Sequence, residues 1–137
     1  MKNIKLLLAI FGLLTAFSFS AAAQNITFTS LEGEKIDLQS QKGKVVVMAI
    51  GASWLPLSRG QAEAINKLSR KYAGRDVAFF FIATDSETAK SKNYASNADI
   101  RKFGESSKLN VSILRDIDGL QTVKQYKVDQ LPTFIIL

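Results

Sequence analysis

Cysteine and histidine are both absent from this sequence of 137 residues. Without cysteine the chain has no disulfide, no thiolate nucleophile and no sulfur ligand for a metal ion. Without histidine it lacks the commonest general base of enzymes and the commonest transition-metal ligand. These absences exclude Ser–His and Cys–His catalysis and argue against zinc, copper and haem sites. We therefore expect neither a metal site nor a cofactor.

A concentration of positive charge is also lacking. The formal net charge is +6, and two of the 18 basic residues, Lys2 and Lys5, lie at the extreme N-terminus. Leaving those two aside, 16 basic residues stand against 12 acidic ones. They form no stripe and are not interleaved with aromatic residues, unlike those of many nucleic-acid-binding surfaces. We expect a solvated basic surface and no nucleic-acid partner.

The N-terminus has the pattern of a targeting segment. Two lysines precede an apolar run from Leu6 to Phe19, and Ala21-Ala22-Ala23 supplies the small residues that a signal peptidase requires. The apolar run is shorter than the roughly twenty residues that cross a bilayer. We expect a cleaved signal peptide at 1–23 and a periplasmic or secreted domain at 24–137, with no membrane span after cleavage. A retained membrane anchor is the alternative interpretation.

The next part of the chain alternates between strand and helix patterns. Residues 26–38 alternate apolar and polar side chains around a glycine, which is typical of a β-hairpin. Continuous apolar runs at 44–50 and 77–83 are typical of strands buried on both faces. Between them, apolar residues at helical spacing predict a helix from about Arg59 to Tyr72. Strand, helix and strand together form a βαβ unit with parallel strands.

Shorter elements follow in the second half. The polar stretch 85–97 is expected to be surface loop with some helix. Asp116 and Asp118 resemble a fragment of a calcium loop, but they fall far short of the six or more oxygen ligands that calcium needs, so we interpret them as a turn. The chain is predicted to be one α/β domain. Its remaining elements are a helix at 98–108, a strand at 111–114, a helix at 120–126 and a strand at 133–137.

Three short motifs follow one another along the chain: GKVVVMAIGASW at 43–54, WLPLSR at 54–59 and VDQLPTFI at 128–135. They resemble the central strand, the active-site motif and the cis-proline loop of the TlpA/ResA-like branch of the thioredoxin superfamily. The resemblance covers about 28–137. It implies a thioredoxin-like fold, with a central mixed sheet, flanking helices and an N-terminal β-hairpin.

The resemblance places Leu55 and Ser58 at the two catalytic cysteine positions of the family, and Gln61 at its glutamate. In the family, the first thiolate attacks a disulfide and the second cysteine releases the mixed disulfide. Leu55 has no nucleophile, and Ser58 has no histidine to activate its hydroxyl. The sequence therefore predicts no catalytic residue and no redox activity, and Gln61 also removes a proton-relay carboxylate.

The groove beside these positions is the candidate binding site. A cis Pro132 would expose the backbone of Leu131 to an extended peptide or protein segment. Structural roles are the alternatives: packing for Trp54, a helix start for Pro56, a helix N-cap for Ser58 and a trans strand entry for Pro132. The peptide-binding candidates are Trp54, Leu55, Pro56, Leu57, Ser58, Leu131 and Pro132.

Three functions stay open at this point. The first is a redox-inactive binding or accessory module, the second a thiol–disulfide oxidoreductase or peroxiredoxin-like reductase by family membership, and the third an incomplete copy without activity. The last is motivated by the C-terminus, because the family's fold continues into a further strand and helix. We expect residues 134–137 to form an uncovered edge through which the chain aggregates or pairs with another chain.

Overall fold

The computed structural model describes residues 26–137, so the predicted signal peptide lies outside the described residues. The strands are β1 (Thr27–Ser30), β2 (Lys35–Asp37), β3 (Val45–Gly51), β4 (Val77–Ala83), β5 (Ser112–Arg115) and β6 (Thr133–Ile136). The α-helices are α2 (Leu57–Lys71), α3 (Asn97–Ser106) and α4 (Leu120–Tyr126). Two short 3-10 helices, η1 (Leu38–Gln41) and η2 (Ile117–Gly119), complete the described elements.

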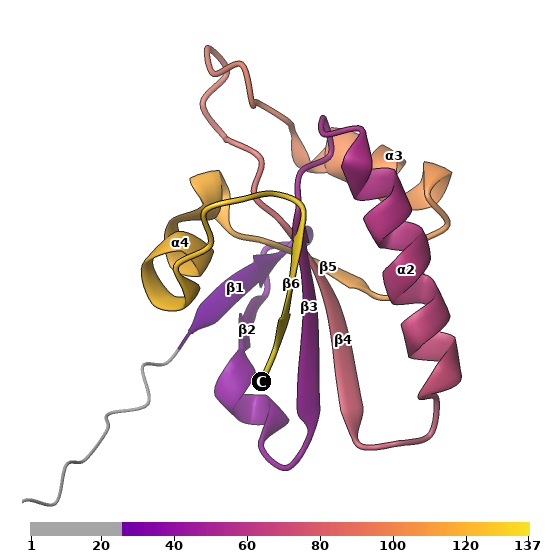
Figure 1. Cartoon of the computed structure of the whole chain (residues 1–137). Coiled ribbons are helices and arrows are strands. Elements are labelled where there is room, and N and C mark those ends of the chain that lie inside the picture. The colour runs from indigo at the N-terminus through magenta and orange to yellow at the C-terminus, as the bar shows by residue number, and fades with distance from the viewer. Residues whose placement is uncertain (1–25) are drawn as a thin grey trace, which may run out of the picture.

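The strands form one mixed sheet in the order β2-β1-β5-β4-β3-β6. β3, β4 and β5 run parallel, whereas β1 and β6 are antiparallel to their neighbours in the sheet. Helices α2 and α3 cover one face, and α4 lies on the opposite side (Figure 1). The carboxyl ends of β3 and β4 therefore reach the same edge of the sheet, where the candidate site lies.

Alternating side chains of β3 and β4 build the core on both faces. Ala49 and Phe81 face α2 and α3, and the rings of Phe81 and Phe103 lie 5.3 Å apart between centroids. Met48 and Ile82 point to the other face and pack with a second apolar cluster. Fully burying a side chain of this kind contributes about 1.5–3 kcal/mol, so these two clusters hold the sheet between its helices.

The predicted hairpin and βαβ unit are confirmed. β1 pairs antiparallel with β2, with Phe28 opposite Ile36. β3 pairs parallel with β4 along its whole length, from Val45 opposite Val77 to Gly51 opposite Ala83. The predicted α/β architecture with a central mixed sheet is confirmed as well.

Two local predictions are wrong. Ser58 does not cap α2: the helix begins at Leu57, Pro56 already has helical φ and ψ angles at the N-cap, and no side chain caps it. The first half of β4 is only half-buried. β5 begins at Ser112, opposite Phe80, so Val77 to Phe79 have no β5 residue paired with them.

Residues 85–97 also differ from the prediction. Before α3 begins at Asn97 the segment contains no helix, and its first two residues, Asp85 and Ser86, are fully buried. The Asp85 carboxylate accepts hydrogen bonds from Ser53 in the loop after β3, and the guanidinium group of Arg115 donates to the carbonyls of Asp85 and Ser86. The polar composition of the segment thus reflects internal hydrogen bonding at its start and solvent exposure further on.

β6 lies at one edge of the sheet. Its side chains alternate between the two faces, and Ile135 packs onto the second apolar cluster. Phe134 and Ile136 are exposed, and Ile136 lines an apolar groove with α2, β3 and β4. Within the described residues, this strand therefore presents both apolar side chains and an open edge.

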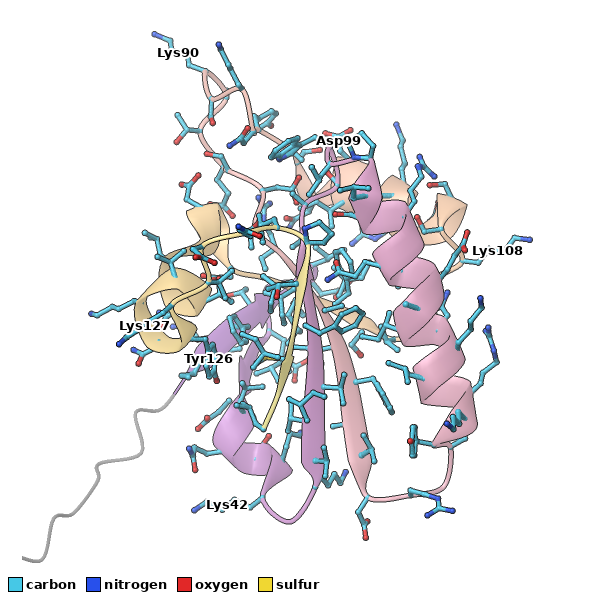
Figure 2. All side chains as sticks on the ribbon, viewed as in Figure 1. Lys42, Lys90, Asp99, Lys108, Tyr126 and Lys127 are labelled. Carbon is cyan, nitrogen blue, oxygen red and sulfur yellow. The ribbon has the colours of Figure 1, made fainter. Side chains whose placement is uncertain are left out.

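The exposed lysines are scattered over the domain. Figure 2 shows Lys42, Lys90, Lys108 and Lys127 projecting from different parts of the surface. Tyr126 on α4 packs against the second apolar cluster, and this burial raises the pKa of its hydroxyl. Among the helices of residues 26–137, none is long and apolar enough to cross a membrane.

Candidate functional site

The loop from β3 to α2 carries the residues at the cysteine positions of the related family. Leu55 lies two residues before the helix and is half-buried. Ser58 lies in the first turn with its side chain fully buried, and its Oγ accepts the backbone N–H of Ala52 at 3.1 Å. Because this hydroxyl is held inside, a ligand on the surface would not touch Ser58.

Asp85 anchors the same loop from the end of β4. Its fully buried carboxylate accepts the backbone N–H of Ser53 at 3.0 and 3.1 Å and the Ser53 hydroxyl at 2.6 Å. Hydrogen bonds to a charged acceptor are stronger than neutral ones. The residue before Trp54 is thereby fixed by both its main chain and its side chain.

Gln61 joins the two strands that flank the site. Its Nε2 donates to the carbonyl of Ile50 at 3.1 Å and to that of Thr133 at 2.5 Å, so it bridges β3 and β6. Its Oε1 is buried without a hydrogen-bond partner among the described residues. A Cβ at Gly51 would lie 2.7 Å from this oxygen and 2.8 Å from Ser58 Oγ, so a larger residue there would displace these side chains. Gln61 thus acts as an internal cross-link.

The proline loop precedes β6, and its Leu131–Pro132 peptide bond is cis. Leu131 and Pro132 are half-buried, and Leu131 packs against the second apolar cluster. Within residues 26–137, the N–H and C=O of Leu131 make no backbone hydrogen bond. These two groups are therefore available to a ligand.

Trp54 and Leu131 meet in one cleft of about 230 Å³, which we call the Trp54 cleft. The indole of Trp54 is 47% exposed, so it is a wall of the cleft rather than a core residue. The other candidates, Leu55, Pro56, Leu57, Ser58 and Pro132, do not line it. The lining residues that sequence reasoning missed are Thr84, Asn93, Asp118, Gly119, Thr122, Val123, Val128, Asp129 and Gln130.

The far wall of the Trp54 cleft is built by the start of α4. Asp116, which is buried, accepts the backbone N–H groups of Gln121 at 2.9 Å and Thr122 at 2.7 Å, so both of its oxygens serve the helix start. The hydroxyl of Thr122 donates to the carbonyl of Gly119 at 3.1 Å. The turn predicted at Asp116 and Asp118 therefore caps the start of α4.

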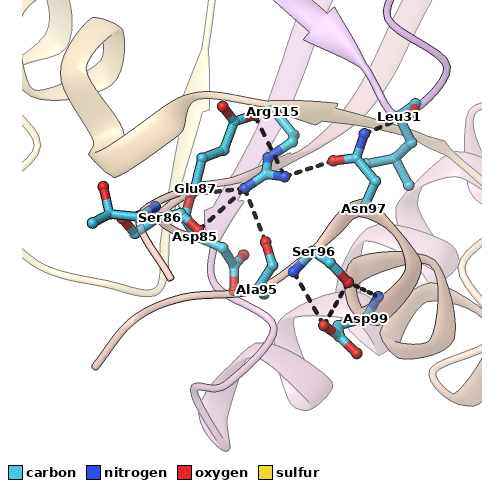
Figure 3. Close-up of polar contacts among 10 residues, drawn as sticks. Leu31, Asp85, Ser86, Glu87, Ala95, Ser96, Asn97, Asp99 and Arg115 are labelled. Atoms are coloured by element: carbon cyan, nitrogen blue, oxygen red, sulfur yellow. Dashed lines mark hydrogen bonds and ion pairs between the residues drawn. The ribbon is translucent and has the colours of Figure 1, made fainter. Parts of the chain in front are cut away.

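A buried arginine holds the segment that leads to Asn93, another lining residue. Arg115 donates through Nη2 to the carbonyls of Asp85 at 3.2 Å and Ala95 at 3.1 Å, and through Nη1 to Asn97 Oδ1 (Figure 3). Glu87 adds an ion pair at 3.7 Å. Breaking a buried charged network is costly, so Arg115 fixes the course of the loop beside the cleft.

The chemistry available at these positions follows from the side chains. Residues 55 and 58 bear no thiol, and the whole chain has none. Within residues 26–137 the Ser58 hydroxyl is hydrogen-bonded to the backbone N–H of Ala52, and none of these residues provides a base that hydrogen-bonds to it. The arrangement offers an aromatic wall, apolar contacts and free backbone groups, which suit binding.

Comparison with known proteins agrees with this geometry. The thioredoxin-like protein YneN of Bacillus subtilis is 30% identical over 115 residues, which are 84% of this chain and 62% of that protein. The thiol-disulfide oxidoreductase ResA of Bacillus cereus is 28% identical over 115 residues, 84% of this chain and 61% of ResA. The chain thus spans about three fifths of the length of these curated relatives.

Solved structures show the same fold. A secreted Mycobacterium tuberculosis disulfide oxidoreductase, described as homologous to E. coli DsbE, matches with a TM-score of 0.66 and 26% identity over 82% of this chain and 75% of its own. A putative thiol-disulfide oxidoreductase from Bacteroides vulgatus matches with a TM-score of 0.68 and 21% identity over 84% and 74%. The second likeness shows the fold alone.

The predicted thioredoxin-like fold and the resemblance to thiol–disulfide oxidoreductases are therefore confirmed. A model described as the AhpC/TSA family matches residues 19–137, well over half of the chain. With that match on a thioredoxin-like fold, the chain belongs to the AhpC/TSA family.

Proposed function

We propose that this protein is an exported, redox-inactive binding module that holds extended peptide or protein segments in the Trp54 cleft. One observation carries the proposal: an exposed Trp54 and Leu131 line the same cleft, while Leu55 and Ser58 occupy the neighbouring cysteine positions of the family. The cleft has an aromatic side chain and apolar side chains in its lining, and the chain has no thiol nucleophile.

Disulfide-exchange chemistry requires a thiol. Disulfide exchange begins with attack by a thiolate and passes through a mixed disulfide, and a chain without cysteine can form neither. The alternative, an oxidoreductase by family membership, is favoured by the names of the relatives and by the fold. The residues at the site favour binding.

The unpaired backbone groups of Leu131 support peptide binding. Its N–H and C=O make no backbone hydrogen bond within the described residues, so an extended segment can pair with both, as an added strand does at a sheet edge. Trp54 and Leu131 then offer apolar contact to the side chains of that segment. Backbone pairing supplies affinity, and the cleft supplies selectivity.

A peptide titration tests this function. We expect an extended apolar peptide to shift backbone amide signals around Trp54 and residues 128–131, and the variant Trp54→Ala to weaken binding. Tyr72→Ala is the matched control, because Tyr72 is an exposed aromatic residue at the far end of α2. Shifts elsewhere, or none at millimolar peptide, would contradict the proposal. An insulin-reduction assay above the buffer blank would restore the oxidoreductase alternative.

Export is the second part of the proposal. It rests on the pattern of residues 1–23 and agrees with the description of the Mycobacterium tuberculosis relative as secreted. We expect the intact mass of protein recovered from the periplasm or the medium to correspond to a chain that begins at Gln24. Full-length protein in the membrane fraction would favour the retained anchor instead.

A further inference from the structure

We propose that the Trp54 cleft selects segments that carry a basic side chain, lysine or arginine, beside the part held at Leu131. This inference rests on the proposed peptide binding and deepens it by naming the class of ligand. It follows from the charge, the aromatic wall and the apolar floor of the cleft.

The charged residues that line the cleft are all acidic. Asp118 and Asp129 line it from two separate segments, the turn before α4 and the proline loop, and no lysine or arginine lines it. Both residues are exposed, and neither carboxylate has an ion pair or a hydrogen bond within residues 26–137. The cleft is therefore a local negative site on a chain whose net charge is +6.

Asp118 is not needed to build the turn in which it lies. Both oxygens of the neighbouring Asp116 already accept the backbone N–H groups at the start of α4. Asp118 instead adopts a left-handed conformation with φ 55° next to Gly119, and its carboxylate is left for the cleft. A positive φ is uncommon outside glycine, although aspartate tolerates it better than most residues.

The other walls suit a long basic side chain rather than a small cation. Val123, Val128 and Leu131 provide an apolar surface along which a methylene stem can lie while its charged end stays in water. The exposed indole of Trp54 attracts a cation over its face, and tryptophan is the best aromatic residue for this contact. The apolar surface, the aromatic face and the carboxylates of the cleft together match the methylene stem and the positive charge of a lysine or arginine side chain.

The test compares two peptides that differ in one side chain. Both are the extended apolar peptide of the binding experiment, with either lysine or norleucine at the central position, so stem length is kept and the charge removed. A cation–π contact and exposed ion pairs predict that the lysine peptide binds roughly 3- to 10-fold more tightly, with the advantage shrinking as salt is added. Dissociation constants are measured for the full chain by calorimetry and by amide shifts.

Charge-neutralising variants locate the effect. In Asp118→Asn and in Asp129→Asn the advantage of the lysine peptide should shrink, because each variant removes one of the two carboxylates and leaves Trp54 in place, whereas the norleucine peptide should bind as before. Asp76→Asn is the matched control, since Asp76 is an exposed aspartate in the loop before β4, outside the cleft. Folding of each variant is checked by its amide spectrum.

The outcomes distinguish a failure of this inference from a failure of the proposed function. Equal binding of the two peptides at the cleft would overturn the basic selectivity and leave peptide binding standing. A lysine preference that is unchanged in both cleft variants, or that shrinks equally in Asp76→Asn, would also overturn it. Binding of neither peptide would overturn both proposals together.

Discussion

Asp85 holds Ser53 through two different groups: its carboxylate lies 3.0 Å from the backbone nitrogen and 2.6 Å from the hydroxyl of Ser53. These residues are 32 positions apart and join the end of β4 to the loop that carries Trp54. The first prediction follows from this contact, because any loosening of the loop moves the wall of the Trp54 cleft.

Asp85→Ala removes the carboxylate and is expected to lower the free energy of unfolding by about 2–3 kcal/mol, since a buried donor then loses a charged acceptor. Ser53→Ala keeps the backbone bond and should cost less, about 1 kcal/mol. Urea unfolding measures both, and Trp54 fluorescence should report a more mobile indole in Asp85→Ala. Equal stability of Asp85→Ala and the parent would contradict the anchoring role.

Gln61→Glu tests the cross-link between β3 and β6. The two carbonyls that accept from Nε2 would face a carboxylate, so the glutamic acid should stay protonated in the fold and its pKa should rise above the ordinary value of about 4.3. The neutral form is favoured in the folded state, so the penalty is absent below the unfolded pKa and grows as the pH rises toward the raised one. Relative to the parent, Gln61→Glu should lose stability progressively above about pH 4. A constant difference from pH 3 to pH 8 would refute this.

Leu55→Cys with Ser58→Cys tests the correspondence with the family's cysteines. One turn separates the two positions, and the backbone N–H of Ser58 donates to the carbonyl of Leu55 at 3.0 Å. Their side chains then approach the roughly 3.5–4.5 Å Cβ separation of a disulfide. We expect the pair to oxidise, and the thiol at position 55 to titrate below the free value of about 8.5 because it precedes a helix N-terminus. Thiol counting and mass spectrometry check the result; a folded variant that never oxidises would show the correspondence to be wrong.

Within residues 26–137 the outer edge of β6 is unpaired, and we expect it to mediate self-association of this chain. Val46 and Leu137 exchange both hydrogen bonds, and since such pairs alternate along antiparallel strands, the backbone groups of Phe134 and Ile136 point away from β3. Two copies paired antiparallel, with Phe134 opposite Ile136 of the second copy, would satisfy all of these groups. Sedimentation should show a concentration-dependent dimer that Ile136→Lys abolishes, because a charge on an edge strand opposes pairing. A parent chain that stays monomeric at high concentration would contradict it.

The capping box at the start of α3 predicts a pH-dependent contribution. Asp99 accepts hydrogen bonds from the side chain and then the backbone of Ser96, and these bonds hold the pKa of its carboxyl below the ordinary value (Figure 3). A lowered pKa stabilises the fold above the unfolded value of about 3.9, and this is lost as the pH falls through the lowered one. In Ser96→Ala the pKa of Asp99, followed by NMR, should rise, and the stability deficit should be largest near neutral pH. An unchanged pKa would disprove the link.

Local sequence determined the elements of the fold. Apolar runs and helical spacing are short-range signals, and they predicted β3, α2, β4 and α4 to within a few residues. Composition determined the missing chemistry just as directly, because a chain without cysteine has no thiol in any conformation. Prediction failed for the Ser58 cap and for the burial of Asp85. In both cases a polar side chain forms a hydrogen bond inside the fold with a residue that is not its immediate neighbour in the sequence.

Only the tertiary structure decided which residues line the Trp54 cleft. Trp54, Asp118 and Asp129 lie on three segments separated by many residues, and no local pattern indicates that they line one cleft. The same holds for Arg115, whose burial depends on carbonyls supplied by the loop after β4. Hydrophobic periodicity specifies which face of an element is buried, but loops meet only where the packed sheet brings their ends together. The proposed binding cleft therefore depends on contacts between loops, whereas the periodicity of the sequence specifies the strands and helices of the scaffold.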